Sequence, residues 1–199
     1  MKRYKAYSKR RGVGRRIFSA LALLLALAGV GLMAYALLNG DLPVSRIVNP
    51  PKEPPAPADT TLKLTIPKMA RVENLTVRTA PATDESALET GALHVEGTGF
   101  PWESGSNVYI AGHRLGYPGT DSYLVFWDLD KLQSGDEVIL TDVSGTRYTY
   151  RVFNSLVAGP YDYHVTEPVP GKSIVSLQTC TLPDYSERLI VQAELVGVA

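Results

Sequence analysis

Three side chains of this sequence could together carry out nucleophilic chemistry on a carbonyl group. Cys180 is the only cysteine among the 199 residues, and it stands where an alternating apolar run ends. His113 follows another apolar run directly after Gly112, and Arg188 begins the run that comes after the cysteine. Attack on a carbonyl needs a nucleophile, a proton-transfer group and donors to the oxyanion that forms. A thiolate, an imidazole and a forked guanidinium can fill these three roles.

Each of these residues also has an ordinary structural explanation when it is considered alone. A lone cysteine at the end of a strand is more often a small packed apolar side chain. A single histidine is more often a structural hydrogen-bonding group, and Arg188 could be a surface charge that pairs with Glu187 or Asp184. The other two histidines, His94 and His164, follow no such strand end and are expected to be structural.

No metal site and no cofactor is predicted. One cysteine and three scattered histidines give no close pair of metal ligands. Five acidic side chains could approach a calcium ion, but they lack the spacing of a dedicated calcium loop. These residues are Asp121, Asp128, Asp130, Asp136 and Glu137. A solvated acidic face is the preferred interpretation.

The elements that must hold the reactive side chains are short strands separated by turns. Leu62, Leu64 and Ile66 alternate with polar residues before Pro67, which is the pattern of a half-buried strand. Further strands are expected over 71–78, 107–111, 137–142, 148–158, 172–179 and 188–196, with a hairpin turn at Ser144-Gly145. Short helical segments are expected over 86–94 and 124–132. This spacing predicts an all-β fold, a closed barrel of seven or eight strands with one or two short helices.

Charge is distributed unevenly along the chain. The first sixteen residues contain eight Lys and Arg side chains and no acid, which leaves twelve basic and twenty acidic side chains in the rest. So acidic a remainder argues against nucleic-acid binding, which needs clustered basic side chains. Residues 17–38 are uncharged and rich in Leu and Ala. At about 1.5 Å per residue, this stretch is long enough to span a hydrocarbon layer of roughly 30 Å.

Four segments are therefore expected. They are a basic cytoplasmic tail (1–16), a single transmembrane anchor (17–38), a Pro-rich stalk (39–61) and a domain outside the cell (62–199). A cleaved signal peptide is the alternative to the anchor, because Ala34-Tyr35-Ala36 fits a cleavage pattern. Against it, the apolar run is longer than the usual ~7–15 residues of a signal peptide. Either way the domain is exported, and its single cysteine cannot form an internal disulfide.

Several motifs of the domain resemble those of sortases, the cysteine transpeptidases of Gram-positive cell surfaces. Ser176-Leu-Gln-Thr-Cys180 resembles the family signature Thr-Leu-x-Thr-Cys, with serine in place of the first threonine. Ile110-Ala-Gly-His-Arg114 is similar to the family's histidine motif, and Arg188-Leu-Ile-Val191 to its arginine strand. Leu88-Glu-Thr-Gly-Ala-Leu-His94 is similar to the segment ahead of the histidine strand. The resemblance covers residues 62–196 in the family's order.

The resemblance implies a catalytic set of Cys180, His113 and Arg188 in a sortase-type barrel. Cys180 would attack a threonine carbonyl in the sorting signal of an exported protein, and His113 would protonate the leaving amine. Arg188 would hold the substrate or stabilise the oxyanion, and Thr179 would help to bind the substrate. The thioacyl enzyme would then transfer the protein to a cell-wall precursor or to another amine, such as a pilin lysine.

Within the family, the chain looks most like class E, with class D second. The features are the short loop between the cysteine and the arginine, the amino-terminal anchor, and an end at Ala199 directly after the last strand. Class E implies a Leu-Ala-x-Thr-Gly signal, and class D implies a Leu-Pro-x-Thr-Ala signal or the related Leu-Pro-x-Thr-Gly.

Two readings from other classes are kept as alternatives. Papain-like peptidases and L,D-transpeptidases also pair cysteine with histidine. However, papain-like enzymes place the thiol at the start of a helix, whereas Cys180 ends a β run. The non-enzymatic alternative is a membrane-tethered β-barrel that binds a surface ligand, with Cys180 as a packing residue.

Overall fold

The computed structural model describes residues 13–38 and 56–199 of the chain. The chain divides into two compact units, Met1–Lys52 and Glu53–Ala199, which are described separately below. The basic tail expected over 1–16 lies mostly outside the described residues, and so does the Pro-rich stalk expected over 39–61.

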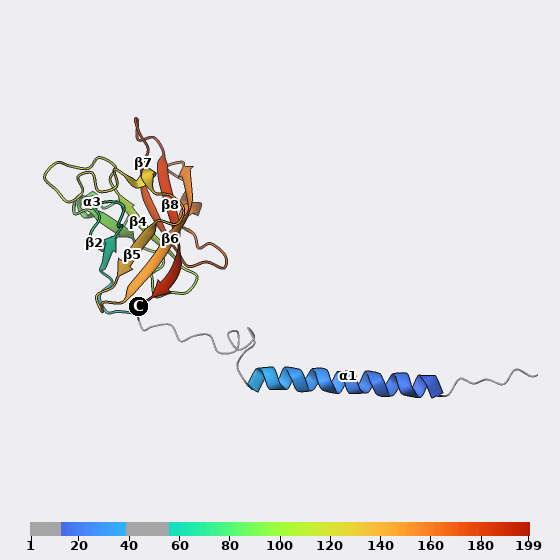
Figure 1. The fold of residues 1–199 in the computed structure, drawn as a ribbon. Coiled ribbons are helices and arrows are strands. Elements are labelled where there is room, and N and C mark those ends of the chain that lie inside the picture. Colours follow the sequence, from blue (N-terminus) through green and yellow to red (C-terminus); the bar gives the residue numbers. More distant parts are fainter. Residues whose placement is uncertain (1–12, 39–55) are drawn as a thin grey trace, which may run out of the picture. The chain divides into compact units, whose positions relative to one another are not determined.

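The described part of the first unit is one helix, α1 (Val13–Leu38), over the stretch expected to be helical (Figure 1). Its side chains are described for residues 21–35, where the large apolar ones are exposed by between 56% for Leu21 and 75% for Leu32. Leu23, Leu24 and Leu25 are consecutive and therefore point to different faces of the helix. Within the described residues, no helix is both long enough and apolar enough to cross a membrane.

Residues 56–199 form a closed barrel of eight strands in the order β1-β2-β3-β4-β7-β8-β6-β5 (Figure 1). The strands are β1 (Leu62–Thr65), β2 (Leu75–Ala80), β3 (Ala92–Val95), β4 (Asn107–Gly112), β5 (Glu137–Thr141), β6 (Arg147–Ala158), β7 (Ile174–Cys180) and β8 (Arg188–Val198). Pairing of β1 with both β2 and β5 closes the barrel. Two pairs, β2 with β3 and β4 with β7, are parallel. The closed barrel predicted from the sequence is confirmed.

Alternation along the strands fills the barrel interior with apolar side chains. In β1, Leu62 and Leu64 are fully buried and Lys63 between them is exposed. Strand β4 is buried on both faces, because Val108 and Ile110 belong to the barrel core whereas Tyr109 belongs to a second apolar cluster. That second cluster also contains Ala158, Val165 and Ile190. Because side chains alternate along a strand, this cluster lies on the outer face of the sheet.

The segment 86–94 is only partly helical, so this expectation needs correction. A short helix, α3 (Glu85–Glu89), begins at Asp84, whose carboxylate accepts a hydrogen bond from the Ala87 N–H at 3.1 Å. Gly91 then turns the chain with φ +127°, and residues 92–95 form β3. Strand formation is favoured here because β3 pairs on both sides, with β2 and with β4.

The helix expected over 124–132 is wrong except for one 3-10 turn, η1 (Leu129–Lys131). The segment instead consists of successive turns closed by hydrogen bonds between residues three apart, such as Val125 to Ser122. Its apolar spacing reflects Val125, Phe126 and Leu129 packing into the barrel core. The second strand also begins later than expected, at Leu75, because residues 66–72 form a hydrogen-bonded loop.

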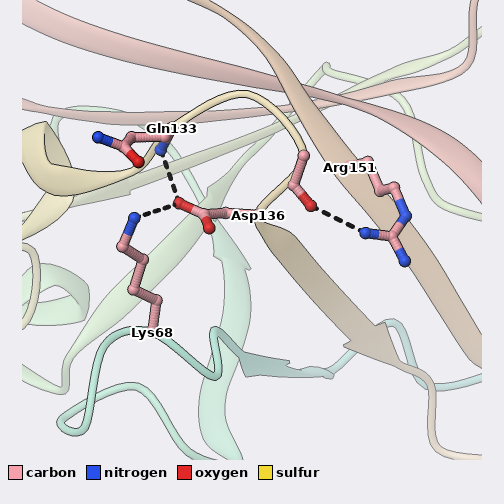
Figure 2. A network of polar contacts seen from close by, with 5 residues as sticks. Lys68, Gln133, Asp136 and Arg151 are labelled. Atoms are coloured by element: carbon pink, nitrogen blue, oxygen red, sulfur yellow. Dashed lines mark hydrogen bonds and ion pairs between the residues drawn. The ribbon is translucent and has the colours of Figure 1, made fainter.

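Carboxylates hold the two ends of β5. At its start, the Asp136 carboxylate accepts hydrogen bonds from the Lys68 ammonium at 2.7 Å and from the Gln133 N–H at 2.6 Å (Figure 2). These contacts, led by the one from Lys68, lower the pKa of Asp136. Beside them, Arg151 of β6 pairs with Glu137 at 2.9 Å. Asp136 therefore joins the β1–β2 loop to the β5 end of the barrel.

At the other end of β5, Asp142 organises the predicted hairpin turn. Its Oδ1 accepts the N–H groups of Ser144 and Thr146 at 2.9 Å and 3.0 Å. Its Oδ2 accepts the hydroxyl of Tyr148 at 3.1 Å. Gly145 completes the turn with φ +87°, a value that glycine adopts without strain.

Candidate active site

The site is built on three neighbouring strands, β4, β7 and β8. Strand register sets Ala111 beside Gln178, and Gln178 opposite Ile190. Because β4 and β7 are parallel, continuing their register by two residues brings His113 level with Cys180. The carboxyl ends of both strands therefore reach the same edge of the sheet, as the sequence motifs require.

Cys180 and Arg188 lie directly opposite each other in the β7–β8 ladder. The N–H of Thr181 bonds the carbonyl of Glu187 at 3.0 Å, so the next pair along, Cys180 with Arg188, is a non-hydrogen-bonded pair. Side chains of such pairs lie closest together, with Cβ atoms about 4.5–5.5 Å apart. The thiol is consequently flanked by the imidazole from the β4 side and by the guanidinium from the β8 side.

Gly112 and Phe126 fix the position of His113. The N–H of Phe126 donates to the His113 carbonyl at 3.1 Å, and the Phe126 ring packs against Gly112. A methyl group at Gly112 would lie 2.7 Å from Cδ2 of Phe126, so only glycine allows this contact. This close packing orients the residue that follows the strand.

One ring nitrogen of the His113 imidazole is left without a hydrogen-bond partner. Its Nε2 is buried and has no hydrogen-bond partner among the described residues. The ring of Tyr117 meets the imidazole edge-to-face with centroids 5.5 Å apart. Buried polar atoms are normally paired, so this unpaired imidazole nitrogen could accept or donate a proton if a ligand reached it.

Arg188 keeps part of its donor capacity free for the site. Its Nη1 donates to the carbonyl oxygens of Tyr185 and Glu187 at 3.2 Å and 3.1 Å, which anchors the guanidinium to its own loop. A guanidinium has five N–H donors, so donors remain for an oxyanion or a peptide carbonyl. The loop contacts hold the positive charge beside the cysteine.

Thr179 faces the opposite way from Cys180. Its side chain is buried, and its hydroxyl donates to the Gly112 carbonyl at 2.8 Å. The residue before the cysteine is thereby tied to the residue before the histidine. This geometry gives Thr179 a positioning role, whereas the expected part in substrate binding stays a prediction.

A pocket of about 370 Å³ unites the predicted residues: His113, Thr179, Cys180 and Arg188 all line it. Its floor comes from β4, β7 and β8, and one wall comes from α3 and the residues before it. A second wall comes from six residues within 159–166, three of which belong to η2 (Tyr163–Thr166). Within the described residues, no cluster of His, Cys, Asp or Glu could hold a metal ion.

The remaining histidines lie outside this lining. His94 is fully buried, and its ring nitrogens contact the Thr79 hydroxyl at 3.1 Å and the Gly99 carbonyl at 2.9 Å. Burial lowers the pKa of His94. His164 is exposed on η2. The contacts of His94 agree with the structural role expected for it, and the expectation for His164 stays a prediction.

Two features of the site escape sequence reasoning. The hydroxyl of Tyr109 donates to Oε1 of Gln178 at 2.7 Å inside the pocket. Asn107 donates from Nδ2 to the carbonyls of Val165 and Glu167, both at 3.0 Å, and so fastens the 159–166 wall to β4. Both residues belong to the fully buried strand β4. The only sign of their contacts in the sequence is that they are polar residues within an otherwise apolar strand.

Comparisons with known proteins agree on one family. The family model described as the sortase domain matches residues 64–196. Sortase A of Streptococcus agalactiae serotype III is 40% identical over 91 residues, which cover 45% of this chain and 36% of that protein. Sortase A of Bacillus anthracis is 33% identical over 92 residues, which cover 46% of this chain and 41% of that protein. The matched part is thus less than half of either relative.

Solved structures of the same family share the fold. Sortase A from Corynebacterium diphtheriae superposes with a TM-score of 0.61 at 28% identity, over 73% of this chain and 64% of that one. Sortase C-1 from Actinomyces oris superposes with a TM-score of 0.61 at 27% identity, over 70% and 74% of the two chains. The eight-stranded barrel is therefore the fold of these proteins.

Proposed function

The chain belongs to the sortase family, and on this basis we propose that it is a cysteine transpeptidase acting on the sorting signals of exported proteins. The observation that carries the proposal is the flanking of Cys180 by His113 and Arg188 at one end of a pocket. A nucleophile, a proton-transfer group and a cationic donor are the three parts that acyl transfer needs.

In the first step, the Cys180 thiolate attacks the carbonyl carbon of the threonine in the signal and forms a C–S bond. The tetrahedral intermediate carries its negative charge on oxygen, which the free N–H donors of Arg188 stabilise. The C–N bond then breaks, and His113 as imidazolium gives its proton to the leaving amine. The products are a thioacyl enzyme and the released carboxy-terminal segment.

In the second step, an acceptor amine attacks the thioester carbonyl. His113, now neutral, takes the proton that the amine loses as the new C–N bond forms. The C–S bond breaks and Cys180 leaves as the thiolate, so the enzyme returns to its starting charge state. An amine of a cell-wall precursor is the proposed acceptor, and a lysine of a pilin is the second possibility.

Signal preference and class follow from sequence resemblance. We assign the chain to class E, with a Leu-Ala-x-Thr-Gly signal, and keep class D with a Leu-Pro-x-Thr-Ala signal as the second assignment. A short loop between Cys180 and Arg188 supports the first assignment. Direct comparison of the two peptides distinguishes them.

The proposed location is the cell membrane, with the amino terminus in the cytoplasm and residues 62–199 outside. Support comes from the uncharged stretch 17–38 after eight basic residues. Protease added outside intact cells should cut the domain, and complete protection would refute this orientation.

The activity is tested by mass spectrometry of the full-length protein incubated with sorting-signal peptides and an amine. The expected products are a cleaved peptide, a thioacyl adduct on Cys180 and a peptide–amine conjugate. Cys180→Ala should abolish all three and keep the fold. Full activity in this variant, or a wild-type thiol that resists alkylation until unfolding, would favour the ligand-binding barrel instead.

A further inference from the structure

One polar pair interrupts the otherwise apolar strand floor of the pocket beyond the reactive side chains. The Tyr109 hydroxyl donates to Oε1 of Gln178 at 2.7 Å. Around this pair the floor and wall are formed by apolar groups such as Ala111, Val165 and Ile190. Ligand pockets commonly fix the orientation of their ligand by a few polar groups placed on an apolar surface.

Tyr109 holds the Gln178 amide in one orientation. The tyrosine is 2% exposed, and burial raises the pKa of its phenol well above the ordinary value against the opposing effect of the Arg188 charge. The phenol therefore stays protonated and donates. With Oε1 of Gln178 accepting that hydrogen bond, the amide nitrogen is turned the other way.

The amide nitrogen of Gln178 is available to a ligand. It makes no hydrogen bond to any of the described residues. Unlike the unpartnered atoms Asn107 Oδ1, His113 Nε2 and Arg114 Nε, it is not buried. Gln178 lines the pocket, so its accessible amide nitrogen lies on a side chain that a bound ligand would meet.

Gln178 and Cys180 lie two residues apart on the same face of β7. At about 3.3 Å rise per residue, their separation along the strand is roughly 6.6 Å. An extended peptide lying along β7 with its scissile carbonyl at Cys180 has the same rise. Its backbone about two residues from that carbonyl therefore lies beside Gln178.

We propose that Nε2 of Gln178 donates a hydrogen bond to a backbone carbonyl of the bound peptide, about two residues before the scissile bond. Tyr109 positions the amide for this contact. The inference rests on the proposed sortase activity and adds to it a residue that sets peptide register. Since the acceptor belongs to the backbone, the contact selects an extended peptide rather than a particular side chain.

The test uses the full-length protein and sorting-signal peptides in which each amide before the scissile bond is replaced, one at a time, by an ester. An ester carbonyl is a weaker acceptor. In the wild type, one ester position should lower kcat/KM by about five- to tenfold, mostly through KM. Gln178→Met should lower kcat/KM by a similar factor for the normal peptide, and the ester at that position should then have no further effect.

Tyr109→Phe keeps the amide but removes the hydroxyl that orients it, so it should weaken the coupling between Gln178 and the ester. Gln192→Met is the matched control. Gln192 lies on β8 outside the pocket and accepts a hydrogen bond from Asn154 at 2.9 Å. Its variant should retain the peptide kinetics and the ester effect, and circular dichroism checks that all variants fold.

An active wild type with equal ester effects in Gln178→Met, or with unchanged kcat/KM in that variant, overturns the inference and leaves the proposed function standing. A wild type that forms no thioacyl adduct with any peptide overturns both. Coupling confined to one ester position and lost in Gln178→Met supports the contact.

Discussion

The Thr179 hydroxyl donates a hydrogen bond to the Gly112 carbonyl at 2.8 Å, so the residue before the cysteine is bonded to the residue before the histidine. Thr179 is 1% exposed, which shields this bond from water. This buried contact therefore adds to the β4–β7 ladder at the strand ends that carry Cys180 and His113.

Thr179→Val tests this contact because valine keeps the shape of threonine and removes the donor. Leaving the buried carbonyl without this donor should cost about 1–3 kcal/mol in the free energy of unfolding. The kcat for peptide cleavage should fall more than KM changes. Urea unfolding and peptide kinetics measure both, and Thr149→Val, at a half-buried position of β6, is the control. Unchanged kinetics in Thr179→Val would limit the hydroxyl to a structural role.

Gly112→Ala should displace His113, because its Cβ would lie 2.7 Å from the Phe126 ring. Overpacking of this kind costs about 1–3 kcal/mol. Misplacement of the proton-transfer group should lower kcat by about 10- to 100-fold. Gly197→Ala, whose Cβ meets nothing within 4 Å, is the control. Adding Phe126→Leu should restore part of the rate, and no restoration would argue against this steric cause.

Arg188→Lys should lose about 100-fold or more in kcat/KM, because a point charge cannot reproduce the forked donor. The variant keeps the positive charge, so charge alone is controlled. Arg147→Lys, at an exposed position of β6, should change nothing. The kcat/KM of each variant should be measured with the same peptide at saturating amine. Near wild-type turnover in Arg188→Lys would show that only the positive charge is used.

Arg114, next to His113, should be energetically coupled to Asp130. Its side chain is 7% exposed, pairs with Asp130 at 2.9 Å and lies 5.6 Å from the centre of the Trp127 ring. A double-mutant cycle on unfolding should give a coupling of about 1–2 kcal/mol, since one partner is buried and the other half exposed. The exposed pair Arg151 and Glu137 should give no more than about 0.5 kcal/mol. Equal couplings would contradict the burial argument.

Asp142 should make the stability depend on pH in the acid range. Burial acts to raise the pKa of Asp142, but hydrogen bonds led by that of Ser144 outweigh it and the net pKa is lowered. Its stabilising contribution is therefore complete above the unfolded pKa of about 3.9 and is lost as the pH falls through the lower folded value. Burial, with the added effect of the Asp142 carboxylate, raises the pKa of its donor Tyr148 to about 12, so this donor is unaffected there.

Urea unfolding between pH 2 and pH 6 measures this dependence. Asp142→Asn should flatten the acid slope of the wild type and lower the stability at pH 6, whereas Asp121→Asn, at an exposed position, should leave the slope unchanged. A wild-type slope that persists in Asp142→Asn would assign the acid sensitivity to other carboxylates.

The placement of the candidate site residues was predictable because they stand at strand ends. Cys180, His113 and Arg188 each lie at the boundary between an apolar run and a loop. The position of such a boundary can be predicted even when the length of the strand is not. The helix expected over 124–132 failed for the opposite reason. There, apolar spacing came from Val125, Phe126 and Leu129 filling the core from successive turns, and single-sequence periodicity cannot distinguish these two origins.

The polar contacts of the pocket were not predictable. Tyr109 and Asn107 belong to a buried strand, where a tyrosine or an asparagine is indistinguishable from an ordinary core residue until its partner is known. Their partners, Gln178 and Val165, lie 69 and 58 residues away in the chain. Pairing of β4 with β7, two strands far apart in sequence, brings Tyr109 to Gln178, whereas Val165 reaches Asn107 from η2.

The parallel pairing of β4 with β7 also bears on how such a protein can diversify. Both strands deliver their reactive residues to one edge, while the chain between them leaves that edge and returns through β5 and β6. The segment 159–166 contacts the floor through the hydrogen bonds of Asn107 and through Val165, which packs in the apolar cluster with Tyr109 and Ile190, and it contains neither Cys180 nor His113. Under the proposed function, substrate choice and bond-making chemistry would therefore rest on different segments of one barrel.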